Sequence, residues 1–483
     1  MSDAPDDIFA GYGANGLFCE MTSAVGMPAG GELAAIRARL SDLGIEELRR
    51  RATEAESELF NLGITFTVYS EKDAIDRILP FDVIPRVLPR ETWREIEDGV
   101  KQRVAALNLF LHDVYHDQRI LGDGVVPRDL VVGNKNFRPE TMGVDLAHGT
   151  YVHICGIDIV RDDAGRVLVL EDNARTPSGV SYVVENRNMM QRTFSDLMLD
   201  LPVLPVENYG VRLLQAMLEI APAGVDDLQV ALLSPGVFNS AYFEHIFLAR
   251  EMGVPLVEGR DLVIEDDRVY MQTTAGLAPV HAIYRRINDD FLDPRAFNPE
   301  SMLGVPGLFD AYRKGNVALA NAIGTGVADD KAVYAYMPRI IRYYLDQAPI
   351  LGNVETHICR EDEGLNYTLD HLDELVVKPV GEAGGYGIVI GPRATQAELD
   401  DCRAQLKEDP ANFISQPMVR LSVSPTLIED GIEPRHIDLR PFAITGRDTW
   451  VLPGGLTRVA LRRGSLVVNS SQGGGSKDTW VLG

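Results

Sequence analysis

Val376-Val377-Lys378-Pro379-Val380, Gly381-Glu382-Ala383-Gly384-Gly385-Tyr386-Gly387 and Ile388-Val389-Ile390 follow one another in the chain. The outer runs are rich in β-branched residues and the middle run holds four glycines, a pattern that predicts strand, loop and strand. Glycine lets a backbone approach a ligand closely and point its N–H groups toward it. Lys378 stands just before the loop, where its ammonium could contact the same anion. A polyphosphate is the natural anion, although a plain hairpin explains this stretch equally well when it is taken alone.

The composition is that of a globular chain of 483 residues, with 45% hydrophobic and 24% charged residues. This length exceeds what one core can support and predicts about two to four domains. The formal net charge of −25 argues against nucleic-acid and anionic-membrane partners. A bound polyphosphate would therefore need cations that gather locally.

The cysteines and the amino terminus indicate the compartment. Four scattered cysteines form no Cys-x-x-Cys pair and favour neither a zinc site nor a disulfide framework. The first residues are acidic rather than signal-like, and no apolar run is long enough to cross a bilayer. We expect a reduced, cytoplasmic protein.

Two motifs near the amino terminus are weak. Gly11-Tyr12-Gly13-Ala14-Asn15-Gly16 matches Gly-x-Gly-x-x-Gly, but no strand precedes it and no βαβ unit surrounds it. His112 and His116 lie one turn apart on a helix predicted over 92–121, and Asp113 replaces the glutamate of the zinc-protease motif. We interpret the first motif as a loop and the second as a solvated helix face. The apolar face of that helix carries Val100, Val104, Leu107 and Leu111.

A hairpin is predicted around Asp162-Asp163-Ala164-Gly165. If its last two residues form a two-residue turn, Asp158 lies opposite Glu171. Asn173 shares the face of Glu171, because side chains alternate along a strand. Two carboxylates and an amide supply the hard oxygen ligands that suit Mg²⁺. A solvated polar face is the alternative, and the apolar residues on the other side of the hairpin do not separate the two.

Residues 205–330 alternate between short apolar strands and helical stretches, which predicts a small parallel sheet. One strand, over 281–284, ends at Arg285 and Arg286. Adjacent arginines at a strand end could bind a carboxylate through paired hydrogen bonds or could be surface charge, and both interpretations stay open. Lys331 then opens a further helical stretch.

The carboxyl-terminal part supplies two more strands with charged residues. Polar and apolar residues alternate over 436–440, which places Asp438 and Arg440 on one face. A hairpin is predicted next, and a two-residue turn in it would place Arg458 opposite Asn469. The glycine-rich stretch that follows lacks the Walker A spacing, so we do not predict a P-loop NTPase.

Taken together, these residues resemble an ATP-grasp enzyme of the glutathione-synthetase-like kind whose segments stand in a rotated order. In that superfamily the Asp…Glu-x-Asn motif closes the chain. Here Asp158…Glu171-Asp172-Asn173 precedes the lysines, the glycine loop and the arginines. From about residue 58 onward the chain resembles the circularly permuted ATP-grasp family, type 2. The rearrangement costs little, because the strands of 151–173 and 436–469 can still share one sheet.

The resemblance implies an α/β (α+β) protein with a circularly permuted ATP-grasp fold, a small Rossmann-like pre-ATP-grasp domain and an N-terminal helical region. The implied divisions are an N-terminal loop and helix (1–57), a helical or mixed region (58–150), the permuted core with the metal strands (151–204), the Rossmann-like domain (205–330), a linker helix (331–371), the lid (372–415) and the rest of the core (416–483).

The resemblance also implies ATP and Mg²⁺ as cofactors, and it assigns roles to residues of this chain. Mg²⁺ would be held by Asp158, Glu171 and Asn173. The catalytic residues would be Arg440, Arg458 and Arg175. Contacts with the nucleotide would come from Lys331, Lys378, Gly384, Gly385, Tyr386, Gly387, Gln416 and Asp438. The acid substrate would meet Ser178, Gly179, Arg285 and Arg286.

The leading functional hypothesis is an ATP- and Mg²⁺-dependent carboxylate–amine ligase that forms a peptide-like amide through an acyl-phosphate and releases ADP. Its partners would be a small-molecule or peptide carboxylate and an amine, with peptide modification suggested by analogy. An ATP-dependent phosphotransferase and a non-catalytic nucleotide-binding scaffold are the alternatives. Amine dependence of ADP release separates the ligase from the phosphotransferase.

Overall fold

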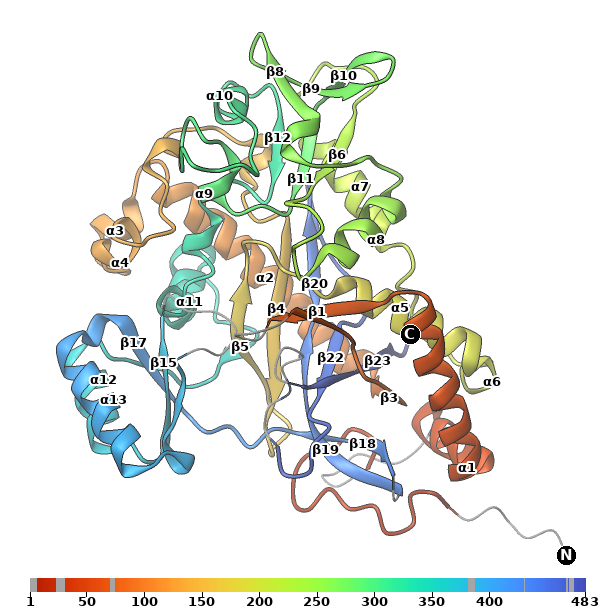
Figure 1. Cartoon of the computed structure of the whole chain (residues 1–483). Coiled ribbons are helices and arrows are strands. Elements are labelled where there is room, and N and C mark those ends of the chain that lie inside the picture. Colours follow the sequence, from red (N-terminus) through yellow and green to blue (C-terminus); the bar gives the residue numbers. More distant parts are fainter. Residues whose placement is uncertain are drawn as a thin grey trace, which may run out of the picture.

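The largest sheet joins strands from both halves of the chain (Figure 1). The computed structural model describes residues 7–22, 31–69, 74–380, 387–429, 431–465, 468 and 473–483. In these residues the sheet runs β13-β5-β4-β19-β22-β23-β3, with β18 beside β19, and β20 beside β4 and β21. The strands are β3 (Phe81–Leu88), β4 (Ile154–Arg161), β5 (Val167–Asn173), β13 (Gly352–Asn353), β18 (Val423–Ile428), β19 (Gly431–Arg440), β20 (Phe442–Thr445), β21 (Thr449–Val451), β22 (Leu456–Val459) and β23 (Gly475–Val481).

Segments that are distant in sequence meet at β4 and β19. These strands are antiparallel neighbours, with Ile159 opposite Leu439. On its other side β19 pairs with β22, where Asp438 lies opposite Arg458. The expectation that the early hairpin and the late strands share one sheet is therefore confirmed for these strands.

Helices cover this sheet and bury their apolar faces on it. The helices α2 (Arg90–Val114) and α11 (Lys331–Leu345) share a hydrophobic core with β4 and β5. Val100, Val104, Leu107 and Leu111 of α2 are fully buried, as the 3.6-residue period predicted. The helices α1 (Glu32–Asn61) and α5 (Val180–Thr193) share another core with β3 and the end of β23. No described helix is both long and apolar enough to span a membrane.

The predicted parallel sheet is present between residues 205 and 330. Its order is β12-β11-β6-β7, and all three pairings are parallel. The strands are β6 (Val230–Leu233), β7 (Leu256–Val257), β11 (Ala282–Arg285) and β12 (Ala318–Ala320), with α7 (Tyr209–Ile220) and α8 (Tyr242–Met252) packed against them. An antiparallel sheet of β8 (Leu262–Glu265), β9 (Arg268–Thr273) and β10 (Gly276–Val280) extends from this unit at the top of Figure 1.

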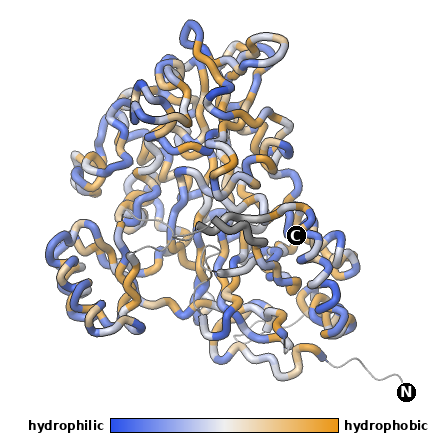
Figure 2. The backbone as a smooth tube through the Cα atoms, in the orientation of Figure 1, coloured by the Kyte–Doolittle hydropathy of each residue, from blue (hydrophilic) through white to orange (hydrophobic). Residues whose placement is uncertain are grey.

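A separate antiparallel sheet carries the strands beside the glycine loop. Its order is β14-β17-β15-β16, formed by β14 (His357–Ile358), β15 (Leu375–Pro379), β16 (Val389–Ile390) and β17 (Phe413–Pro417). The helices α12 (Asp362–Asp370) and α13 (Gln396–Glu408) lie beside it, and their residues alternate between hydrophilic and hydrophobic in Figure 2, as expected for helices with one packed face. The predicted strands on both sides of the loop are confirmed, whereas Gly384, Gly385 and Tyr386 lie outside the described residues.

The remaining elements are short. They are β1 (Thr65–Tyr69), β2 (Ala74–Ile78), α3 (Arg119–Gly122), α4 (Arg128–Val132), α6 (Ser195–Met198), α9 (Asp289–Leu292) and α10 (Leu308–Arg313). The Gly-x-Gly-x-x-Gly match lies in residues 7–22, which form turns without helix or strand, as predicted. Asp113, between the two histidines of α2, is buried and accepts hydrogen bonds from the N–H groups of Arg119 and Ile120. It therefore caps α3 rather than facing solvent.

The predicted turn of the early hairpin is wrong, although the predicted pairing is right. Arg161 pairs with Val167, and the N–H of Asp162 donates to the carbonyl of Arg166, which leaves a three-residue turn. Gly165 has φ of 83°, as the last residue of such a turn requires. A bulge further along the pair then restores the register, so that Asp158 faces Glu171.

The predicted pairing of Arg458 with Asn469 is also wrong. Arg458 lies between Asp438 of β19 and Ser476 of β23, so both edges of its strand are occupied. Asn469 itself lies outside the described residues. The strand β23 begins inside the glycine-rich stretch that resembles a phosphate loop, and its Lys477 is fully buried. The Lys477 ammonium contacts the Asp82 carboxylate and donates to the carbonyl of Pro425 at 2.7 Å.

This burial predicts the effect of Lys477→Ala. The substitution leaves the buried Asp82 without its cation and should lower the free energy of unfolding by about 3–5 kcal/mol in urea denaturation. Lys407→Ala, on the exposed face of α13, is the control and should change it by less than about 0.5 kcal/mol. Equal stability of the two variants would contradict the structural role.

Candidate functional site

Four charged side chains from three neighbouring strands form a chain of alternating sign. Arg440 donates to Asp158 from Nε at 2.5 Å and from Nη2 at 2.9 Å. Arg458 donates from Nη2 to the same carboxylate at 2.8 Å. Its Nε contacts both oxygens of Asp438, at 2.9 and 3.0 Å. The Asp158 carboxylate thus holds the guanidiniums of Arg440 and Arg458 close to each other.

Burial and charge oppose each other in this cluster. Burial alone would raise the pKa of Asp158, but the guanidiniums of Arg440 and Arg458 outweigh it and hold that pKa below its ordinary value. Burial raises the pKa of Asp438, and the Arg458 guanidinium compensates only in part. Asp158 is therefore the carboxylate that stays ionised, and it keeps both arginines in position.

The predicted metal residues converge on this cluster. Glu171 lies opposite Asp158 across the strand pair, and Asn173 Nδ2 donates to Asp158 Oδ1 at 3.3 Å. The Lys331 ammonium, at the start of α11, lies 3.7 Å from Glu171 Oε1. Burial raises the pKa of Glu171, and the negative charge of Asp158 adds to this shift. The Glu171 carboxylate thus lies near a second carboxylate, that of Asp158, and near the ammonium of Lys331.

The oxygen atoms of the predicted metal residues fit Mg²⁺, but Asp158 is less available to the ion than Glu171 and Asn173. Both oxygens of Asp158 already accept from guanidiniums, so the Glu171 carboxylate and the Asn173 amide oxygen are the groups best placed to bind the ion. These are hard oxygen donors, and Mg²⁺ commonly combines one or two of them with water and substrate phosphates. Among the described residues, no cluster of three or more histidine, cysteine, aspartate or glutamate side chains forms a metal site by itself.

The antiparallel sheet of β14, β17, β15 and β16, which we call the lid sheet after the lid predicted over 372–415, contributes a lysine. Lys378 on β15 is half-buried and donates to Gln416 Oε1 at 2.6 Å, and Gln416 donates in turn to Thr356 Oγ1 at 2.9 Å. Burial lowers the pKa of Lys378 to about 8, with the positive charge of Lys331 acting in the same direction and Glu171 against it. A lysine of β15 and a lysine at the start of α11 therefore influence each other near Glu171. Gly387, with φ of 70°, follows the undescribed part of the glycine loop.

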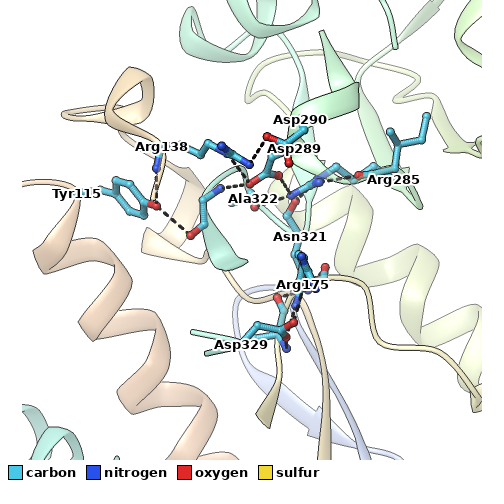
Figure 3. Close-up of polar contacts among 12 residues, drawn as sticks. Tyr115, Arg138, Arg175, Arg285, Asp289, Asp290, Asn321, Ala322 and Asp329 are labelled. Atoms are coloured by element: carbon cyan, nitrogen blue, oxygen red, sulfur yellow. Dashed lines mark hydrogen bonds and ion pairs between the residues drawn. The ribbon is translucent and has the colours of Figure 1, made fainter. Parts of the chain in front are cut away.

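The segment after β5 is fixed by a clamp that the sequence did not reveal. Asn321 Nδ2 donates to the carbonyls of Ala174 and Arg175 at 2.8 and 3.2 Å. The N–H groups of the same two residues donate to Asp329 Oδ1 at 2.6 and 3.1 Å, and Arg175 Nε lies 3.4 Å from Asp329 Oδ2 (Figure 3). The main chain of Arg175 is therefore held on one side by Asn321 and on the other by Asp329.

Arg285 binds a carboxylate of its own chain. It is fully buried, lies 2.6 Å from Asp289 and donates to the carbonyls of Asn321, Ile287 and Ala322 at 2.7–2.9 Å (Figure 3). The surface-charge interpretation is wrong for this residue. Its guanidinium supports the turn that carries Asn321, and a contact with substrate stays a prediction.

Arg286 is also buried and holds the loop that follows β5. It donates to the carbonyl of Pro177 at 2.6 Å and to Glu244 Oε1 at 3.1 Å. Glu244 Oε2 accepts from the N–H of Gly179 at 2.7 Å. The carbonyl of Ser178 accepts from Arg440 Nη1 at 3.2 Å. Of the four predicted substrate residues, Ser178 thus contacts the arginine cluster, and Gly179 beside it is held by Glu244.

Gly179 has a geometric reason to be glycine. Its φ is 111°, and a Cβ there would come within 2.9 Å of Leu456. A side chain at this position would strain the backbone and push against β22.

A second support lies behind Glu171 and was missed from the sequence. Asp172 points to the opposite face of β5 and receives Arg103 of α2 at 2.5 and 2.8 Å. Arg103 Nη1 also donates to Asn353 Oδ1 at 2.8 Å. The signal was available, because Arg103 lies three residues after Val100 and four before Leu107, which places it on the apolar face of the predicted helix.

The antiparallel lid sheet, the large mixed sheet and the lysines and arginines between them define the ATP-grasp class of fold. The chain belongs to the circularly permuted ATP-grasp type 2 family, whose model matches residues 85–460. The predicted fold class, a permuted ATP-grasp fold with a Rossmann-like unit, is therefore confirmed.

Several proteins are similar over most of the chain. An uncharacterized protein of Synechocystis is 53% identical over 92% of each chain, and one of Mycobacterium tuberculosis is 50% identical over 98% of this chain and 86% of its own. A Frankia alni protein provisionally named a glutamate–cysteine ligase is 42% identical, and the match covers 92% of this chain and 52% of the relative. A glutathione synthetase-like effector of Globodera pallida shares the fold, with a TM-score of 0.57 at 12% identity, over 91% of this chain and 98% of its own.

The lowered pKa of Lys378 predicts how nucleotide binding depends on pH. Below pH 8 the Lys378 ammonium is charged and would contribute to phosphate binding, and above pH 8 it loses its proton in the free protein. The affinity for MgATP, measured by calorimetry, should therefore fall as pH rises through about 8, approaching the loss of one charge-assisted contact, about 1.5–3 kcal/mol.

Lys378→Arg is the matched control, because a guanidinium stays charged over this range. Its affinity should be nearly flat between pH 7 and pH 9.5. The unfolding free energy gives a second check of the sign: the unfolded chain binds more protons above pH 8, so the Lys378 contribution should make stability rise with pH there. An identical fall of affinity in Lys378→Arg would show that another group titrates.

Proposed function

We propose that the protein is an ATP- and Mg²⁺-dependent carboxylate–amine ligase that activates its acid as an acyl-phosphate and releases ADP. The observation that carries the proposal is the pair of arginines, Arg440 and Arg458, held by one ionised carboxylate beside Glu171 and two lysines. Such a cluster suits the transfer of a phosphoryl group, whose charge must be stabilised as it moves. The provisional name of the Frankia relative supports amide ligation, although this chain spans only about half of that protein.

The family resemblance implies roles for these residues, and their positions support the proposal. Lys331 and Lys378 would bind the phosphates of ATP, and Gln416 with its neighbouring lid backbone would meet the adenine. Gly384, Gly385, Tyr386 and Gly387 would cover the phosphates, and Asp438 would position Arg458. A guanidinium has five N–H donors, so each arginine can keep its carboxylate and still donate to a phosphoryl oxygen. Mg²⁺, bound by Glu171 and Asn173 beside Asp158, would neutralise phosphate charge.

The reaction would proceed in two displacements. A carboxylate oxygen of the acid attacks the γ-phosphorus and the bond to ADP breaks. The amine nitrogen then attacks the acyl carbon, loses a proton and expels phosphate. Arg175, Ser178 and Gly179 would hold the acid, because their segment is fixed against Arg440 by Asn321, Asp329 and Glu244. A closed lid would keep water from the acyl-phosphate.

The domain division is proposed on the same basis. The strands of the lid sheet extend from His357 to Pro417, and a lid over that range includes α12 and is wider than 372–415. The Rossmann-like unit over 205–330 would contribute Arg286 and Glu244 to the substrate side. The amine and acid would be small molecules or peptide ends, and nucleic acid or membrane would take no part.

Trapping with hydroxylamine tests the proposal. Given ATP, Mg²⁺, candidate acids and cell extract as a source of acids, the protein should form ADP and a hydroxamate in equal amounts. Arg458→Ala should reduce both by at least about 100-fold, because an arginine that stabilises transferred charge contributes about 3–4 kcal/mol. Arg462→Ala, an exposed arginine nearby, should retain full activity.

Other products would favour the alternatives. ADP with a phosphorylated alcohol and no hydroxamate would indicate a phosphotransferase. Nucleotide binding without ADP or hydroxamate from any acid source would indicate a scaffold. AMP and pyrophosphate would contradict phosphoryl transfer altogether.

A second prediction concerns Glu171→Gln. Turnover should be lost, because the amide removes the carboxylate that faces the proposed metal. The melting temperature without metal should stay the same or rise, because burial and Asp158 both disfavour the Glu171 charge. Calorimetric Mg²⁺ titration in the presence of a non-hydrolysable ATP analogue should show weaker binding than in the wild type. Normal turnover at saturating Mg²⁺ would exclude Glu171 as an essential ligand.

A further inference from the structure

A cavity of about 410 Å³ lies beside the Rossmann-like unit and contains none of the candidate site residues. It is bounded by the 3₁₀ turn η2 (Ala147–Gly149), the end of α7 and the edge strand β12. Most of its inner wall is apolar, as with Ile220 and Leu319. Its volume suits a molecule of about amino-acid size.

The buried end of the cavity offers a hydrogen-bond acceptor. His153 is 4% exposed and lines the cavity. Its Nδ1 lies 3.1 Å from the carbonyl oxygen of Thr445, which can only accept, so Nδ1 carries the proton. Burial lowers the pKa of His153 to about 4, which keeps the ring neutral at physiological pH. Nε2 is therefore the unprotonated nitrogen.

The mouth of the cavity carries charges of both signs. Asp145 and Glu219 bring carboxylates. The Asp145 side chain is 94% exposed and lies 3.4 Å from His116 Nε2, and Glu219 Oε2 accepts from the N–H of Arg447 at 2.8 Å. Arg447 brings a guanidinium that forms no ion pair with any residue in the described part of the chain. Two carboxylates disfavour a polyphosphate at this mouth, and the guanidinium disfavours a polyamine.

We propose that this cavity is an effector site for an amino-acid-sized zwitterion with an apolar side chain. The carboxylate of the ligand would pair with Arg447, its ammonium with Asp145 or Glu219, and its side chain would pack on Ile220 and Leu319. A ligand side chain with an N–H or O–H group would gain a further bond to Nε2 of His153.

The effector site is connected to the candidate active site through Asn321. The N–H groups of His153 and Ile154 donate to Asn321 Oδ1 at 2.8 and 2.7 Å. The other end of the same side chain holds the carbonyls of Ala174 and Arg175 (Figure 3). Asn321 also directly follows β12, whose middle residue lines the cavity. A ligand that stiffens this wall would therefore stiffen β4 and the end of β5, the strands of Asp158 and Glu171.

Calorimetry with each of the twenty amino acids, on nucleotide-free protein, tests binding. At least one apolar or aromatic amino acid should bind. Arg447→Ala should weaken its binding at least tenfold, and Ala223→Trp, which places a large side chain at the exposed rim, should abolish it. Arg212→Ala, an exposed arginine outside the cavity, should bind as the wild type does. Failure of all twenty to bind, or unchanged binding in Arg447→Ala, would overturn the site.

Hydrogen exchange with the bound amino acid tests the connection. The amides of His153, Ile154, Ala174 and Arg175 should exchange more slowly with ligand than without it, and Ala223→Trp should show no such response. Slower exchange confined to the cavity rim would overturn the effector role. Both readouts are independent of turnover, so failure of the ligase proposal would leave this test intact.

Discussion

The contact of Asp158 with both Arg440 and Arg458 constrains the rest of the structure. Removing three charged groups from water is costly, and the cost is offset only when their geometry is correct. That geometry requires β4, β19 and β22 to be neighbours in one fixed register, since each strand supplies one member. The order in which the chain supplies these strands has no influence on the contact. The permutation is tolerated for this reason.

The supports behind the site show how the constraint is met. Arg103 fixes Asp172 from the α2 side, which sets the orientation of Glu171 on the other face of β5. Asn321 ties the beginning of β4 to the segment after β5. Glu244 and Arg286 hold the next loop against the Rossmann-like unit. The large sheet and the Rossmann-like unit therefore meet at the loop that would carry the acid substrate.

The sequence predicted what depends on local spacing. The 3.6-residue period of α2 and the alternation along β19 are properties of single elements, and both were confirmed. The pairing of Asp158 with Glu171 was also predicted. The prediction holds only because the turn has one residue more than expected and a bulge shifts the register back by one residue. The predicted pairing of Arg458 with Asn469 was wrong, because β23 was not recognised as a strand. It is β23 that pairs with the edge of β22 assigned to Asn469. The partners of Asn321 and Arg285 could not be predicted, since they come from main-chain carbonyls that only the tertiary fold brings near.

A crystal structure with Mg²⁺ and a non-hydrolysable ATP analogue tests the central claim most directly. We expect γ-phosphate oxygens within hydrogen-bonding distance of Arg440 and Arg458, with Asp158 still in contact with both guanidiniums and the metal on Glu171 and Asn173. A nucleotide bound elsewhere, or one whose γ-phosphate contacts neither arginine, would contradict it.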